Sequence, residues 1–158
     1  MGISFSDMWD LIQENHSPVV FSRELLVGIF WEETMFTNRK QLQGPAVGFG
    51  QVEPATMKAV NAYYSTNYSV SLILIDDPTS VAITSDVLSM FNDKGLSPSG
   101  ALNAYAGASV RAANKKKVQQ WLACERILKN GGTGDPDNVR AALMAAEPNH
   151  GGAVDSVL

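Results

Sequence analysis

The chain has 158 residues, of which 45% are hydrophobic and 18% are charged, with a formal net charge of −4 at neutral pH. This length and composition indicate one globular domain with a single core. The acidic balance argues against a nucleic-acid-binding protein. The single cysteine, Cys124, excludes an internal disulfide and is expected to be a small apolar residue on a helix.

Helical spacing dominates the chain and predicts a mostly α fold. Ser6 is positioned to cap a first helix that carries Met8 and Ile12 on one face. Ser22 is positioned to cap a second helix, whose centre over residues 25–31 is apolar nearly all round. A helix of that kind is expected to be the buried centre of the molecule.

Residues 37–53 lose helical periodicity and are predicted to form a loop or a small irregular hairpin. Pro54 suits the first turn of a helix that runs to about Tyr64. The short alternation over residues 70–74 predicts a strand or the end of an apolar loop, and the pattern does not choose between them.

Four further helices are predicted in the second half of the chain. The first of them begins at Asp77 and the second at Ser97. The third covers about residues 118–128, and the fourth begins at Asp135. We predict one domain over residues 1–158, with its core over about 7–147 and a small, polar, frayed tail over 149–158.

Two adjacent carboxyls, Glu32 and Glu33, close the apolar second helix. The partial negative charge of a helix C-terminus and the desolvation by apolar neighbours both raise the pKa of a carboxyl. Glu33 shares a face with the core residue Ile29, whereas Glu32 is directed elsewhere. A carboxyl between an apolar helix end and an open polar loop suits acid-assisted cleavage of a sugar bond; alternatively, both are solvated acids.

The order of motifs over residues 7 to about 122 resembles the lysozyme-like superfamily, closest to soluble lytic transglycosylases and goose-type lysozymes. Residues 33–36 read Glu-Thr-Met-Phe where the family has Glu-Ser-x-Phe, and residues 48–56 read Gly-Phe-Gly-Gln-Val-Glu-Pro-Ala-Thr where it has Gly-Leu-Met-Gln-x-x-Pro-x-Thr. Weaker matches follow in the right order: Asp-Pro at residues 77–78 and Ala-Tyr-Ala-Gly at 104–107.

The resemblance implies a lysozyme-like fold, in which a small irregular lobe flanks a cleft beside the central helix. It also implies that Glu33 is the catalytic acid/base. Substrate-binding positions are then expected at Thr34, Gly48, Phe49, Gly50, Gln51, Glu53 and Tyr105. For several of these a purely structural role is an open alternative: Gln51 as a cap of the helix at Pro54, Tyr105 as a core residue, and the glycines as turn formers.

Glu53 stands where the family usually has an apolar residue. Hydrolysis by two acids needs a second carboxylate beside the bond, and Glu53 is the only other acidic residue between Glu33 and Asp76. If Glu53 faces the cleft, water is a possible acceptor. If it does not, Glu33 alone suits the transglycosylase scheme, in which the sugar's own 6-hydroxyl closes an anhydro ring.

The densest basic cluster consists of Arg111 and residues 115–117. It is interpreted as a solvated helix face or as a rim that attracts an anionic wall polymer. The two histidines, His16 and His150, lie far apart without ligand spacing, so we expect no metal site and no cofactor.

The resemblance thus predicts a glycosidase that cleaves the β-1,4 bond between N-acetylmuramic acid and N-acetylglucosamine in peptidoglycan. A non-catalytic glycan-binding module, or an enzyme for chitin or chitosan, are the alternatives. No signal peptide and no membrane-spanning segment are visible. We therefore expect synthesis in the cytoplasm and action at the bacterial wall or periplasm, as an exported antibacterial effector with an immunity partner or as a phage lysis enzyme.

Overall fold

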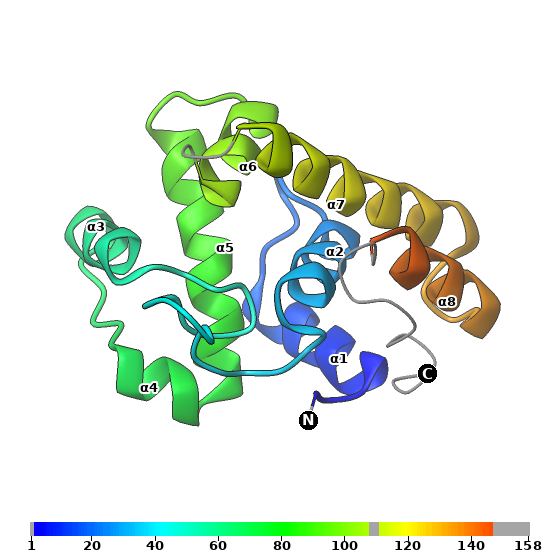
Figure 1. Ribbon diagram of the computed structural model, residues 1–158, viewed down its shortest axis with the longest axis horizontal. Helices are drawn as coiled ribbons and strands as arrows, with labels where there is room; N and C mark the ends of the chain where they lie inside the picture. Colours follow the sequence, from blue (N-terminus) through cyan, green and yellow to red (C-terminus); the bar gives the residue numbers. More distant parts are fainter. Residues whose placement is uncertain (1, 108–110, 147–158) are drawn as a thin grey trace.

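The computed structural model describes residues 2–107 and 111–146, with eight α-helices in those ranges. The same residues contain two isolated antiparallel bridges and no named strand, which confirms the mostly α prediction. The helices are α1 (Phe5–Asn15), α2 (Arg23–Thr34), α3 (Pro54–Tyr64), α4 (Val70–Ile75), α5 (Asp77–Asp93), α6 (Pro98–Ala106), α7 (Arg111–Gly131) and α8 (Pro136–Ala145) (Figure 1).

Side-chain caps fix most of the helix starts. Ser22 caps α2 as predicted, and Ser97, where a helix start was predicted, caps α6; each accepts a bond from the backbone N–H three residues later. The first helix differs from the prediction: Ser4, not Ser6, is its cap, because the Ser4 hydroxyl accepts from the N–H of Asp7 at 3.1 Å.

Residues 70–75 form a helix, so the predicted strand or apolar loop end is wrong. Ser69 caps this short helix by accepting from the N–H of Leu72. An isolated strand leaves its backbone groups unpaired, and no strand lies among the described residues to complete a ladder. A helix satisfies those groups within the segment while burying Ile73.

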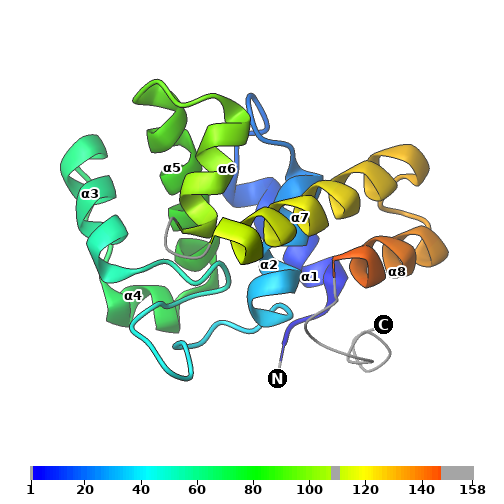
Figure 2. The ribbon, with the colours of Figure 1, turned by 45° about the horizontal axis from the view of Figure 1, so that its top comes forward.

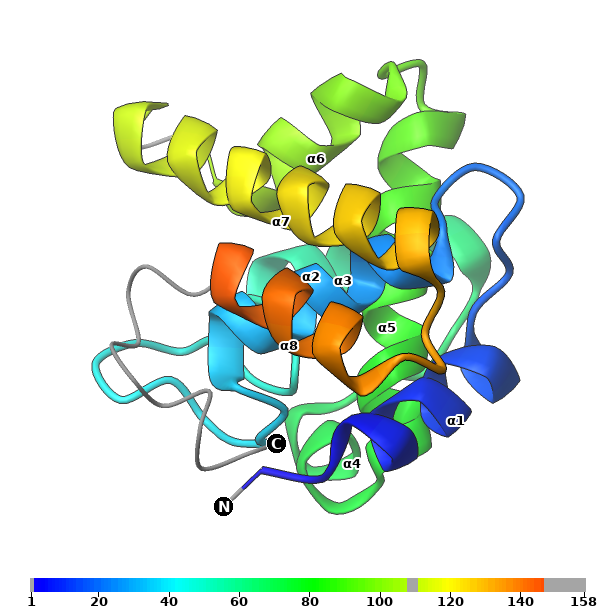
Figure 3. The same ribbon diagram turned by 90° about the vertical axis from the view of Figure 1, so that its right-hand side faces the viewer.

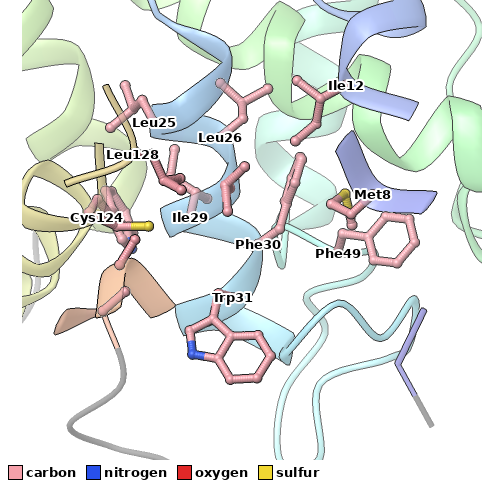
Figure 4. Packing of buried hydrophobic residues seen from close by; sticks show 14 of the residues in the cluster. Met8, Ile12, Leu25, Leu26, Ile29, Phe30, Trp31, Phe49, Cys124 and Leu128 are labelled. Atoms are coloured by element: carbon pink, nitrogen blue, oxygen red, sulfur yellow. The ribbon is translucent and has the colours of Figure 1, made fainter. Parts of the chain in front are cut away.

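The central position predicted for the second helix is confirmed. α2 buries apolar side chains around its whole circumference, against α1 on one side and α7 on the other (Figures 3 and 4). Figure 4 shows Met8 of α1 near Phe30, while Cys124 of α7 lies on the opposite side of the helix. Gly28 permits the close approach of α7, because a Cβ there would lie 3.1 Å from the backbone of Trp121.

A second, smaller apolar cluster joins α3, α4 and α5 beside the main core. Its buried members are Val47, Val52, Met57, Val60, Ile73, Ile83, Val87 and Met90. Helix α5 contributes to both clusters, with Val81 and Leu88 in the main core. It therefore lies between α3 and α4 on one side and the bundle of α1, α2, α7 and α8 on the other (Figure 1). The predicted tail, residues 149–158, lies outside the described residues.

The segment over residues 35–53 links α2 to α3 and passes between the two parts of the molecule (Figure 2). Within the described ranges, no helix has the length and apolar character to cross a membrane.

Candidate functional site

The segment that follows α2 is an irregular hairpin, as predicted. Val47 and Val52 exchange two backbone hydrogen bonds, of 3.0 and 2.9 Å, and Val47 also bridges to Lys40. Gly48 has a φ of 87°, and a Cβ there would lie 2.7 Å from the Ser80 hydroxyl oxygen. Gln51 follows in a left-handed conformation with a φ of 52°, which is uncommon for a residue with a side chain.

Tyr105 of α6 and Thr84 of α5 fix the turn at Gly50. The Tyr105 hydroxyl donates to the Gly50 carbonyl oxygen at 2.7 Å and lies 2.9 Å from the Thr84 hydroxyl, which is therefore the donor in that second bond. A Cβ at position 50 would collide with both hydroxyls. Only glycine lets the turn approach these helices so closely.

Thr34 and Phe49 lie behind this turn instead of facing solvent. The Thr34 hydroxyl lies 2.8 Å from the Phe49 carbonyl oxygen and 3.2 Å from that of Phe30, so it ties the end of α2 to the hairpin. The Phe49 ring is fully buried against Phe30, with ring centroids 5.9 Å apart. Their side chains stabilise the hairpin against α2.

A pocket of about 290 Å³ opens between the end of α2 and the hairpin. It is lined by Glu33, Gln41, Ala46, Gly50, Gln51, Val52, Glu53, Thr56, Val87, Phe91, Ala104, Tyr105, Ala106, Gly107 and Lys117. Five of the predicted site residues are thus brought together: Glu33, Gly50, Gln51, Glu53 and Tyr105. The other three, Thr34, Gly48 and Phe49, are not among the lining residues.

Gln51 holds the hairpin together from the pocket wall. Its side-chain amide donates to the carbonyl oxygens of Arg39 and Gly48 at 3.0 and 2.9 Å. The N-cap of α3 is Glu53, whose side chain makes no capping bond, so the alternative in which Gln51 caps this helix is wrong. Glu53 is exposed and reaches the pocket.

Glu33 has the electrostatic environment of a carboxyl that keeps its proton near neutrality. Its side chain is 12% exposed. Burial above all, and then the negative charge of Glu32, raise the pKa of Glu33 to about 7. Glu32 itself is only 4% exposed. The alternative of two solvated helix-end acids is therefore wrong, because α2 is buried on all sides up to its last turn.

Lys117 is the site residue that the sequence interpretation missed. Its ammonium nitrogen lies 2.9 Å from a Glu33 carboxylate oxygen, and this ion pair opposes the rise in the pKa of Glu33. Burial acts to lower the pKa of Lys117, but the charges of Glu33 and Glu32 outweigh it and raise that pKa.

Helical spacing contains the signal that identifies Lys117. It lies four residues before the buried Trp121 and seven before the buried Cys124, so it belongs to the inward face of α7. Lys115 and Lys116 are exposed, as expected of a solvated face, and the Arg111 side chain lies outside the described residues.

The described residues contain no group of three or more histidine, cysteine, aspartate or glutamate side chains placed to hold a metal ion. No protein-family model matches the chain, and neither a curated protein nor a solved structure matches it.

Proposed function

We propose that the protein is a lysozyme-like glycosidase that cleaves the β-1,4 bond between N-acetylmuramic acid and N-acetylglucosamine in peptidoglycan. The proposal combines the motif resemblance at residues 33–36 and 48–56 with one structural observation. That observation is a largely buried carboxyl, Glu33, with a pKa of about 7 at the wall of an open polar pocket. The pocket volume is close to the lower end of the usual range for ligand sites, ~300–1,000 Å³.

In the proposed reaction Glu33 acts first as general acid and then as general base. Protonated Glu33 gives its proton to the glycosidic oxygen as the bond to the sugar C1 breaks. The resulting carboxylate then takes a proton from the acceptor. In a transglycosylase the acceptor is the sugar's own 6-hydroxyl, which closes an anhydro ring. In a muramidase the acceptor is water.

The other lining groups support a polysaccharide substrate. Gly50 brings backbone close to the pocket without a side chain. Gln41 can donate its side-chain N–H groups to sugar hydroxyls, and Gln51, whose N–H groups are bonded within the hairpin, can accept through its side-chain carbonyl oxygen. Glu53 lines the same pocket, which supports the version of the proposal in which water is the acceptor. An enzyme of this kind acts at the bacterial wall or periplasm, after export or cell lysis, and an exported toxin is paired with an immunity protein.

The test is digestion of purified cell-wall sacculi, with the released muropeptides identified by mass spectrometry. Glu33→Gln is expected to lower the release rate by at least ~10²-fold, because it removes the transferable proton. The matched control is Glu14→Gln on the exposed face of α1, which is expected to keep the full rate. A Glu33→Gln variant that keeps most of its rate would exclude this assignment, and soluble oligosaccharides of chitin and chitosan would then identify another glycan substrate.

The ion pair between Lys117 and Glu33 favours a second candidate, a glycan-binding module without activity. In that pair the Glu33 carboxyl accepts a hydrogen bond from the Lys117 ammonium, and in its ionised form it also accepts hydrogen bonds from sugar hydroxyls. Co-sedimentation with sacculi without any released muropeptide would support this candidate over the enzyme.

A further inference from the structure

Three charged side chains meet at the end of α2, and only one of them is explained by the proposed reaction. Glu33 lines the pocket, Glu32 is buried beside it outside the pocket lining, and the Lys117 ammonium lies 2.9 Å from Glu33. We propose, on the basis of the proposed function, that Glu32 and Lys117 are opposed positioning residues for the Glu33 proton: Glu32 retains it and Lys117 releases it.

The two neighbours act on Glu33 with opposite sign at short range. Glu32, the adjacent and buried carboxyl, acts through its negative charge, which favours the protonated form of Glu33. Lys117 acts through its positive charge and its hydrogen bond, both of which favour the carboxylate. Since both carboxyls are largely buried and the Lys117 side chain is 32% exposed, these interactions are screened less than those of fully exposed ion pairs.

The remaining titratable groups described around Glu33 do not replace this pair. Tyr105 of α6 lines the same pocket, but burial above all raises its pKa and keeps the phenol neutral. Glu53, just before α3, also lines the pocket, yet it is an exposed side chain, so solvent weakens its effect on Glu33. Among the described residues, Lys117 is the cation that contacts Glu33.

An opposed pair has a chemical use that a single neighbour lacks. The acid step needs Glu33 protonated, and the base step needs the same oxygen to carry charge. With Lys117 alone the carboxyl would be ionised at neutral pH and unable to start the reaction. With Glu32 alone it would hold its proton too firmly to release it to the glycosidic oxygen. Burial does most to raise the pKa of Glu33, and the opposed pair then holds that pKa near neutrality, where both steps run.

The test is the pKa of the Glu33 carboxyl, measured by carbon-detected NMR titration of the full chain, with Glu33→Gln used to assign the signal. Glu32→Gln removes a charge with little change of shape and is expected to lower the pKa of Glu33 by about 1. Lys117→Met keeps the length and apolar stem and is expected to raise it by about 1. Lys116→Met, an exposed neighbour on α7, is the matched control and should leave it unchanged.

Two further variants keep the test decisive if a single variant is poorly folded. Lys117→Arg preserves the charge and should keep the pKa of Glu33 near the wild-type value. The double variant Glu32→Gln/Lys117→Met should return it toward that value because the opposed effects cancel. An unchanged pKa in either Glu32→Gln or Lys117→Met, or shifts of the same sign, overturns the proposal.

The titration does not depend on catalysis, so it separates this proposal from the proposed function. Shifts of opposite sign in a protein that releases no muropeptides would support the opposed roles of Glu32 and Lys117 and would exclude the proposed glycosidase activity. In an active enzyme, the alkaline limb of the rate profile should move to lower pH in Glu32→Gln and to higher pH in Lys117→Met.

Discussion

The pocket has two walls of different construction. The helical wall (Glu33, Tyr105 and Lys117) belongs to α2, α6 and α7, and its groups are at least partly withdrawn from water. The loop wall (Gln41, Gln51 and Glu53) belongs to the hairpin before α3 and carries polar groups that are more open to solvent.

The difference between the walls follows from what each has to do. A carboxyl pKa moves by several units only where water is excluded and neighbouring charges are fixed, which packed helices provide. A hydrated polymer is instead bound by polar groups near the surface, which an irregular segment can supply once its backbone is held. The hydroxyl contacts at Gly50 join the two walls, so a substitution at Gly50 is expected to have the largest effect on stability.

Gly50→Ala is expected to break the junction between the walls. The added methyl group collides with the hydroxyls of Tyr105 and Thr84, so either the hairpin or α6 must move. We expect the free energy of unfolding to fall by about 3 kcal/mol, measured by urea denaturation. Gly134→Ala is the matched control, because a Cβ there meets no atom within 4 Å. Equal stability of the two variants would contradict the described contact.

The helical wall should make stability depend on pH in a recognisable direction. The pKa of Glu33 is raised in the folded state, from 4.5 to about 7. The folded protein therefore binds more protons than the unfolded chain between those values, and its stability falls as pH rises through that window. The loss due to Glu33 is about 3 kcal/mol, and most of it has occurred by pH ~7.

Urea denaturation at pH 4.5 and pH 8 tests this dependence. Glu33→Gln should show a smaller fall in stability between the two pH values than the wild type, and it should be the more stable protein at pH 8. A fall of equal size in both proteins would mean that Glu33 has an ordinary pKa.

The two walls also differ in how far the sequence predicts them. Helix α3 begins and ends where Pro54 and Tyr64 were expected, and the hairpin follows from its glycines and proline. Such features depend on a few neighbouring residues, each with its own backbone preference. The alternation at residues 70–74 misleads because five residues are too few to separate a strand from a short helix.

Contacts between distant segments could not be predicted from the sequence. Lys117 meets Glu33 across 84 positions of sequence, although its place on the inward face of α7 is visible in the helical period. Likewise, Thr34 and Phe49 match motif positions, but their side chains are buried by the packing of the hairpin on α2. Which side of a hairpin faces the pocket is decided by that packing and not by the local pattern.

Tyr105→Phe weakens the same junction without a collision. The variant loses the bond to the Gly50 carbonyl oxygen and the contact with Thr84, so stability should fall by about 1 kcal/mol. Tyr68→Phe, which removes a 2.6 Å bond to Asp86 away from the pocket lining, is the matched control with a similar loss of stability. Only Tyr105→Phe should also slow muropeptide release, and equal rates in both variants would argue that the turn position is unimportant for activity.

Glu53→Gln has the smallest expected effect on stability and sharpens the comparison at the level of chemistry. The side chain is exposed and makes no capping bond, so the free energy of unfolding should change by less than ~0.5 kcal/mol.

The effect of Glu53→Gln should fall on the reaction products. If Glu53 orients an attacking water, products with a reducing end should decrease about tenfold, because general-base help is lost. Anhydro products need only Glu33 and should be released at the wild-type rate, which mass spectrometry separates by the mass of one water molecule. An equal decrease of both products would show that Glu53 binds the glycan and does not select the acceptor, so that chemistry would rest on the helical wall alone.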